Sequence, residues 1–215
     1  MRYRTENQIT LVWIRHGETK ANQEQRYLGR TDEDLSEKGI ETLLSYKKQN
    51  FYPKVTHLFT SPMKRCVETG AVLYPELSPV VIPEWREMDF GQFEYKNYEE
   101  LKDDVRYQAW IDSGGALDFP GGESRENFIL RCEKGFLKMC GELQQLAGQN
   151  GKEAIRAGII VHGGTIMALF SSYGGHSYFD YQVPNGRGYI CRMEGWPVRA
   201  VPGKKCVRIK EMVRI

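Results

Sequence analysis

Two short apolar runs, each ending in a histidine that is followed by glycine, constrain the fold of this chain more than any other feature. Residues 9–14 read ITLVWI and lead into Arg-His-Gly, and residues 158–161 read GIIV and lead into His-Gly-Gly. Runs this short, apolar and β-branched are typical of strands buried on both faces, which belong to sheets covered by helices on each side. We therefore expect a layered α/β fold in which two histidines follow buried strands.

The rest of the chain alternates between strand-like runs and helix-length amphipathic segments, without an internal repeat or a low-complexity linker. Ser36 is a suitable N-cap for the first helix, and the Ser61-Pro62 pair is typical of a helix start with proline at the first helical position. The pattern predicts strands over 55–60, 79–82, 188–193 and 206–212, and helices over 36–49, 62–73, 123–148 and from residue 164 or 165 onward.

Residues 84–122 fit neither pattern. They contain four aromatic residues between positions 90 and 98 and two more at Tyr107 and Trp110. The end of the segment, residues 114–122, is rich in glycine and proline. We expect a loop with short helices that forms a cap over a pocket. The chain is thus interpreted as a single domain, 1–215, with a cap-like insertion around 88–122.

The composition excludes several classes of function. The 215 residues carry 30 Lys and Arg against 28 Asp and Glu, and a net charge of +2 argues against a nucleic-acid partner. No apolar run reaches the length of a membrane span and the N-terminus lacks a secretory signal, so we expect no membrane partner and a cytoplasmic location. The cysteines lack a C-x-x-C pair, so free thiols are expected at Cys66, Cys132, Cys140, Cys191 and Cys206.

Charged and titratable side chains follow three of the expected strands. They are Arg15 and His16 after the first strand, Arg65 in the first helical turn after strand 55–60, and His162 after the run that ends at 161. Ligands of open α/β sheets bind beyond the carboxyl ends of the strands, so these side chains are expected to converge. Guanidinium groups match phosphate oxygens, and positive neighbours favour a neutral imidazole, which can attack phosphorus. The pattern predicts a phosphate-ester site.

Each of these features alone has an ordinary structural explanation. A single histidine at a strand end is more often structural, as His57 and His176 are expected to be. An arginine after Ser-Pro is usually part of the surface, and a Gly-Gly pair is usually a turn. The basic C-terminal tail, which includes Arg214, is expected to be a solvated face. The joint occurrence of Arg-His-Gly and His-Gly-Gly after the two best strands favours the functional interpretation.

Seven motifs in the chain resemble the histidine phosphatase superfamily, in its phosphoglycerate-mutase-like branch. They occur in the family's order and span residues 11–164. The motifs are RHGET at 15–19 with Asn22, GRTD at 29–32, LSEKG at 35–39, SPMKR at 61–65 with Thr69, REMDFG at 86–91, PGGES at 120–124 and VHGG at 161–164. The resemblance implies a three-layer α/β/α sandwich with a mostly parallel sheet and a small cap over the C-terminal strand ends.

The resemblance also implies a role for each matching residue. His16 would be the nucleophile that becomes phosphohistidine, and Glu87 would protonate the leaving oxygen and then activate water. The phosphoryl oxygens would be held by Arg15, Asn22, Arg65 and His162, with Gly29 and Gly163 as further substrate contacts. No metal and no cofactor is implied, and the sequence holds no carboxylate cluster suited to binding one.

Within the family, a phosphomonoesterase fits this chain better than a mutase. Residues 88–115 are acidic and aromatic, and their three basic residues, Lys96, Lys102 and Arg106, are too few to require a second phosphate site. The size and motif order are similar to those of small bacterial α-ribazole phosphatases, so α-ribazole 5'-phosphate is one candidate for the small-molecule phosphoester. The aromatic residues of the expected cap would suit a substrate with a flat or apolar part.

Two alternatives stay open at this stage. One is a phosphoglycerate-mutase-type phosphotransferase, and the other is a non-catalytic phosphate-binding regulatory protein with the same fold. The presence of a nucleophile, an anion clamp and an acid in one set of motifs argues against the regulatory alternative. A homodimer is left open as the assembly.

Overall fold

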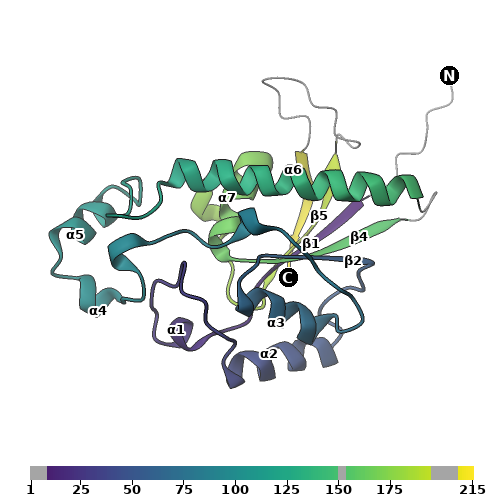
Figure 1. The fold of residues 1–215 in the computed structure, drawn as a ribbon, viewed down its shortest axis with the longest axis horizontal. Coiled ribbons are helices and arrows are strands. Elements are labelled where there is room, and N and C mark those ends of the chain that lie inside the picture. Colours follow the sequence, from purple (N-terminus) through teal and green to yellow (C-terminus); the bar gives the residue numbers. More distant parts are fainter. Residues whose placement is uncertain (1–8, 150–153, 195–207) are drawn as a thin grey trace.

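A computed structural model of the protein describes residues 9–149, 154–194 and 208–215, whose strands form a six-stranded sheet between two layers of helices (Figure 1). The sheet has the order β3-β2-β4-β1-β5-β6. Its strands are β1 (Ile9–Arg15), β2 (His57–Thr60), β3 (Val80–Val81), β4 (Ile155–Val161), β5 (Gly188–Glu194) and β6 (Arg208–Arg214).

Parallel pairing joins β3, β2, β4 and β1, and antiparallel pairing joins β5 to both β1 and β6. The sheet is therefore mostly parallel, and β1 lies inside it between β4 and β5. These observations confirm the expected α/β fold. They also explain why the first apolar run has no polar face, since a central strand is covered on both sides.

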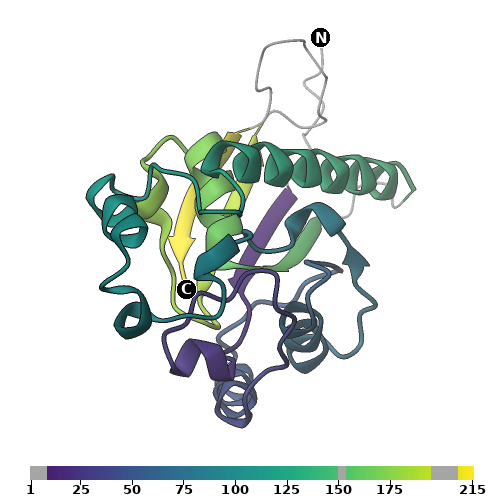
Figure 2. The same cartoon turned by 60° about the vertical axis from the view of Figure 1, so that its left-hand side comes forward.

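The helices of the described residues fall into two covering layers and an outlying group. They are α1 (Lys20–Gln23), α2 (Glu37–Lys48), α3 (Lys64–Leu73), α4 (Tyr98–Leu101), α5 (Val105–Asp112), α6 (Arg125–Gln149) and α7 (Gly163–Tyr173). The views of Figures 1 and 2 show α6 and α7 on one side of the sheet and α2 and α3 on the other. Short 3₁₀ turns occupy Pro83–Trp85, Gly91–Phe93 and Tyr178–Tyr181.

Alternate side chains of β1 enter two separate cores. Leu11 and Trp13 join the core that packs under α6 and α7, whereas Val12 and Ile14 join the core under α2 and α3. Trp13 is fully buried, and its ring centroid lies 5.8 Å from that of Trp85. The bulky tryptophan before the first histidine motif thus anchors the larger core.

Three helix starts differ by one or two residues from the prediction, and α6 is one of them, because it begins at Arg125 and not at residue 123. The helix after β2 begins at Lys64, with Met63 in extended conformation at its N-cap, so Pro62 lies in the preceding turn and not in the first helical position. The backbone N–H of Ser61 donates to the carbonyl of Ile160 at 3.0 Å, which continues the sheet pairing past the end of β2. The last long helix begins at Gly163.

The predicted cap segment, residues 88–122, contains α4, α5 and one 3₁₀ turn. Both views show α4 and α5 beyond the layers, at the left of the molecule (Figures 1 and 2). The interpretation of this segment as a cap stays a prediction. The four described cysteines are buried free thiols, and Cys206 lies outside the described residues.

Helix α2 depends on a close approach to the segment after β1. Ser36 caps the helix, because its Oγ accepts from the N–H of Gly39 at 3.0 Å and donates to the carbonyl of Glu18 at 3.0 Å. A Cβ on Gly39 would fall 2.1 Å from that same carbonyl oxygen. Only glycine at this position lets α2 lie against the backbone that follows His16.

We predict that Gly39→Ala lowers the free energy of unfolding by about 1–3 kcal/mol, because the added methyl group overpacks against backbone. Gly141 is the matched control, since it is interior to α6 and a Cβ there would meet nothing within 4 Å. Gly141→Ala should stabilise the protein by about 0.5–1 kcal/mol through helix propensity alone. Urea unfolding of both variants measures this. Equal responses would show that the approach of α2 does not depend on Gly39.

Candidate active site

Two parallel strands bring the two histidine motifs together. Arg15 ends β1 directly opposite Val161, which ends β4, so the residues that follow emerge side by side. The rings of His16 and His162 have centroids 5.3 Å apart and planes inclined by 67°. Both side chains are buried, with 3% and 0% of their surface exposed.

The ring of His16 is fixed by one hydrogen bond to the next residue. Its Nδ1 lies 2.7 Å from the carbonyl oxygen of Gly17. A carbonyl oxygen only accepts, so Nδ1 carries the proton and the neutral ring keeps a lone pair on Nε2. Burial, reinforced by Arg65 and Arg15, lowers the pKa of His16 well below its ordinary value. The neutral form with a free Nε2 can act as a nucleophile.

His162 occupies the position just before α7. Its Nε2 lies 2.7 Å from Ser61 Oγ, and the N-terminus of α7 begins at the next residue, Gly163. Burial is again the largest cause that holds the pKa of His162 well below its ordinary value, followed by the charge of Arg65. The helix N-terminus adds backbone N–H groups beside the two rings, an arrangement that favours a bound anion.

The guanidinium of Arg65 is fixed by hydrogen bonds to backbone carbonyls of the loop at 28–31. One terminal nitrogen donates to the carbonyl of Thr31 at 2.9 Å, and the other donates to the carbonyl of Gly29 at 3.0 Å. The side chain is fully buried, and its Nε has no acceptor among the described residues. The contacts of Gly29 are therefore to Arg65 and, through its N–H, to Glu94 at 3.0 Å, and its direct contact with substrate stays a prediction.

Arg15 shows the same arrangement on the other side of the histidines. One terminal nitrogen donates to the carbonyl of Val183 at 2.9 Å, while Nε is buried without an acceptor in the part of the chain that the structure describes. A Cβ on Gly163 would lie 3.6 Å from this Nε, so the glycine backbone borders the guanidinium closely. Two arginines thus present unpaired N–H groups around His16 and His162.

Glu87 lies against the first turn of α7. Its Oε1 accepts from the N–H of Met88 at 3.0 Å, and a Cβ on Gly164 would come within 2.4 Å of the same oxygen. Burial raises the pKa of Glu87, although the hydrogen bond from Met88 and the charges of Arg65 and Arg15 lower it in part. A carboxyl group with a raised pKa can hold a proton near neutral pH and give it up.

Asn22 is linked to the backbone of His16 by Asn185, a residue that the sequence analysis did not predict at the site. The side-chain amide of Asn185 donates to Asn22 Oδ1 at 3.0 Å and to the carbonyl of His16 at 3.1 Å. Asn185 belongs to the turn that leads into β5 and is 169 residues from His16 in sequence. No local motif marks it, and only the return of β5 beside β1 brings it to the site.

A cleft next to Arg15 and Glu87 has a polar part and an aromatic part, which share Glu87, Gly164, Met167 and Gln182. The polar part has a volume of about 500 Å³ and is lined by Arg15, Gly163 and Arg214 among others. Arg214 is exposed, as expected for a solvated tail, but its side chain also lines the cleft and donates to the carbonyl of Gln182 at 2.9 Å.

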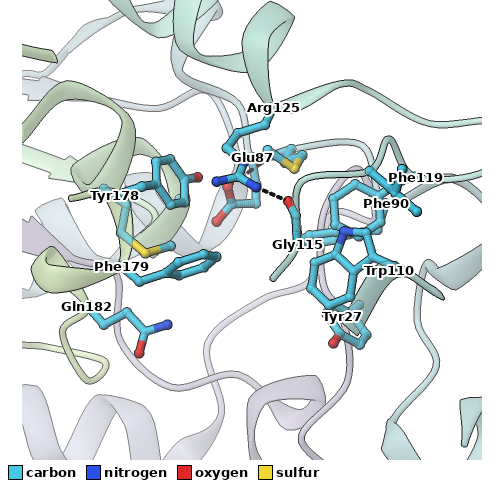
Figure 3. Close-up of a pocket in the computed structure, with 14 residues that line it drawn as sticks. Tyr27, Glu87, Phe90, Trp110, Gly115, Phe119, Arg125, Tyr178, Phe179 and Gln182 are labelled. Carbon is cyan, nitrogen blue, oxygen red and sulfur yellow. Dashed lines mark hydrogen bonds between the residues drawn. The ribbon is translucent and has the colours of Figure 1, made fainter. Parts of the chain in front are cut away.

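The aromatic part has a volume of about 290 Å³ and extends from Glu87 toward residues 110–119 (Figure 3). Figure 3 shows Arg125 above Glu87, with Tyr178 beside it. Neither Arg125 nor Tyr178 was a predicted site residue. Arg125 lies near the start of a predicted helix, and no motif marks Tyr178.

The described residues contain no group of three His, Cys, Asp or Glu side chains arranged to hold a metal ion. In the same part of the chain, none of the helices combines the length and the apolar character required to span a bilayer.

Comparison with known proteins identifies a family and several relatives. The model of the histidine phosphatase superfamily, branch 1, matches residues 11–196. The adenosylcobalamin/α-ribazole phosphatase of Escherichia coli K12 is 31% identical over 138 residues, which cover 62% of this chain and 68% of the relative. A putative phosphoserine phosphatase 2 of Hydrogenobacter thermophilus is 26% identical over 193 residues, covering 86% and 90%.

Among solved structures, a putative α-ribazole-5'-P phosphatase from Escherichia coli K-12 superposes with a TM-score of 0.74. The superposition covers 86% of this chain and 91% of the other, at 24% sequence identity. This likeness supports the fold. The site thus combines two buried histidines, two arginines with unpaired Nε–H groups and one buried carboxyl group.

Proposed function

The chain belongs to the histidine phosphatase superfamily, and we propose that it hydrolyses small organic phosphomonoesters, without a metal ion, through a phosphohistidine formed on His16. The observation that carries this proposal is the hydrogen bond from His16 Nδ1 to the carbonyl of Gly17. This bond leaves Nε2 unprotonated, and the nearby Arg15 and Arg65 each have a buried Nε–H group without an acceptor among the described residues. A nucleophile and an anion clamp thus occur at the same place.

The unpaired N–H groups would be satisfied by phosphate oxygens. Buried donors without partners are rare in proteins, and Arg15 and Arg65 each have such a donor at Nε. Phosphate is dianionic and accepts several charge-assisted hydrogen bonds at once. His162, the amide of Asn22 and the first N–H groups of α7 complete the set of groups that would surround the phosphoryl group.

The reaction would proceed in two steps. In the first, Nε2 of His16 attacks phosphorus, the bond from phosphorus to the ester oxygen breaks, and Glu87 transfers its proton to the departing alcohol. In the second, Glu87 takes a proton from water as the water oxygen attacks phosphorus, and the bond to Nε2 breaks to release inorganic phosphate. Arg15 and Arg65 would balance the negative charge of the phosphoryl group in both steps. They would thus supply the charge stabilisation that other phosphatases obtain from metal ions.

The physiological substrate and setting are further parts of this proposal. The name of the Escherichia coli relative makes α-ribazole 5'-phosphate the first substrate to test. We place residues 88–122 as a cap over the leaving group, because six of these residues line the cleft next to Glu87, among them the aromatic Phe90, Trp110 and Phe119. The buried free thiols at the four described cysteines agree with a reducing, cytoplasmic location. The balanced charge favours neither a nucleic-acid nor a membrane partner.

A mutase is the second candidate, and one observation favours it. A mutase must hold a second anionic group of its substrate, and Arg214 is an arginine that lines the polar part of the cleft beside Arg15. The guanidinium of Arg214 is exposed and donates to the carbonyl of Gln182. Release of inorganic phosphate from a monophosphate, measured against phosphoryl transfer to a second alcohol, separates the two reactions.

We predict that the purified protein hydrolyses p-nitrophenyl phosphate in the presence of EDTA and that rapid quenching traps one acid-labile, alkali-stable phosphoryl group. His16→Ala should abolish the trapped label and lower the rate by at least about 10³-fold, since the nucleophile is lost. His57→Ala is the matched control, because His57 lies at the opposite end of β2 from the site. Label that persists in His16→Ala, or activity that needs a divalent ion, would contradict the proposal.

We predict that Glu87→Gln slows transfer from an alkyl phosphate by about 10²–10⁴-fold and transfer from p-nitrophenyl phosphate far less. An alkoxide needs a proton to depart, whereas p-nitrophenolate is stable as an anion. Since burial raises the pKa of Glu87, the wild-type rate on alkyl phosphates should fall only when the pH rises through that raised value and the acid ionises.

Asp89→Asn is the control for this experiment, because Asp89 is the next carboxyl group in the chain and accepts from the N–H of Gly91 at 2.9 Å. Single-turnover rates on both substrates give the comparison. Equal losses on the two substrates in Glu87→Gln, or a selective loss in Asp89→Asn, would move the role of general acid away from Glu87.

A further inference from the structure

The aromatic part of the cleft is a slot between two sets of rings, here called the aromatic pocket. Its walls are Tyr27, Phe90, Trp110 and Phe119 on one side and Tyr178 and Phe179 on the other (Figure 3). The rings of Trp110 and Phe119 have centroids 5.1 Å apart, and those of Tyr178 and Phe179 lie 5.2 Å apart. Each wall is therefore a packed aromatic surface.

The two walls converge at Gly115. A Cβ built there would lie 3.2 Å from a ring carbon of Trp110 and 3.4 Å from a ring carbon of Phe179. Phe179 is nevertheless 45% exposed, because much of its ring borders the open slot. An apolar cavity of about 150 Å³ accommodates benzene. The 290 Å³ of this pocket is therefore large enough for a substituted ring or for two fused rings.

The aromatic pocket lies where the alcohol part of a phosphomonoester must go. Arg15 lines the polar part of the cleft and does not line the aromatic pocket, whereas Glu87 and Gly164 line both. A phosphoryl group held at Arg15 would thus place its ester oxygen at Glu87, on the boundary. The rest of the molecule would extend past Glu87 between the rings.

Among the described residues, the aromatic pocket offers an anionic substituent no cation that is free of other contacts. Its charged lining residues, among those described, are Glu87 and Arg125. Arg125 is already engaged, because it donates to the carbonyl of Gly115 and its guanidinium lies 5.5 Å and 5.6 Å from the ring centroids of Tyr178 and Phe179. The faces of aromatic rings carry negative potential, which repels a carboxylate and attracts neutral or positive groups.

We propose that the aromatic pocket selects phosphomonoesters whose alcohol part is a flat, uncharged ring system, stacked between Trp110 and Phe179. This inference rests on the proposed phosphatase activity and adds the chemical class of its substrate. Small charged phosphoesters would leave the rings in contact with water and bring a carboxylate against the ring faces. Ring-bearing substrates would instead cover exposed aromatic surface, and the binding energy of the ring would hold the ester oxygen at the acid.

The experiment compares kcat/KM for 2-phenylethyl phosphate and for propyl phosphate, whose leaving alcohols have similar acidity. Burial of one phenyl ring predicts a preference of about ten- to hundredfold for the phenylethyl ester. Phe179→Ala should reduce this ratio toward unity, and Trp110→Leu should do the same from the opposite wall. Tyr98→Ala is the matched control, because Tyr98 is an aromatic residue of α4 that is 53% exposed and does not line the pocket, and it should leave the ratio unchanged.

The outcomes distinguish this inference from the proposed function. If the protein hydrolyses none of the three substrates (2-phenylethyl phosphate, propyl phosphate and p-nitrophenyl phosphate), the proposed phosphatase activity is overturned, and this inference with it. Equal turnover of the two esters would overturn only the inference. A preference for O-phosphoserine or 3-phosphoglycerate over 2-phenylethyl phosphate would also overturn it and would identify Arg214 as the group to vary next.

Discussion

The hydrogen bond from His16 Nδ1 to the carbonyl of Gly17, 2.7 Å long, is the contact on which the chemistry of this site depends. An imidazole in solution exchanges its proton between two nitrogens and takes up a second one in weak acid. Here the carbonyl fixes the proton on Nδ1, and burial with two arginines nearby disfavours the second proton. Nε2 is consequently available as a base and a nucleophile next to two arginines.

The fold serves to keep that carbonyl and that ring in place. β1 is central in the sheet, with Trp13 in one core and Ile14 in the other, so the backbone that ends in His16 is anchored from both faces. Asn185 donates to the carbonyls of both His16 and Gly17, and the packing of α2 fixes the following residue, Glu18. In phosphoryl transfer the protein contributes mainly by positioning the reacting groups and by stabilising charge, so a fixed His16 ring matters for the reaction.

The sequence allowed the layered fold and the convergence of His16, Arg65 and His162 to be predicted, because buried strands and strand-end motifs are local signals. Asn185 and Arg214 were not predictable in this way. Asn185 reaches His16 from the turn before β5, and Arg214 reaches the cleft from β6. Their neighbours in sequence carry no periodic pattern that fixes where these side chains point. The start of α3 was wrong by two residues because Ser61 extends the sheet pairing before the helix begins.

The most direct test of the account is the tautomer and charge of His16 in the free protein, measured by ¹⁵N NMR of the histidine rings with two-bond proton correlations. We predict a neutral ring, protonated on Nδ1 and unprotonated on Nε2, that remains neutral well below the pH at which an ordinary imidazole takes up its second proton. His57, which is only half-buried, should take up its proton at a higher pH than His16. An imidazolium at His16 near neutral pH, or a proton on Nε2, would contradict the account.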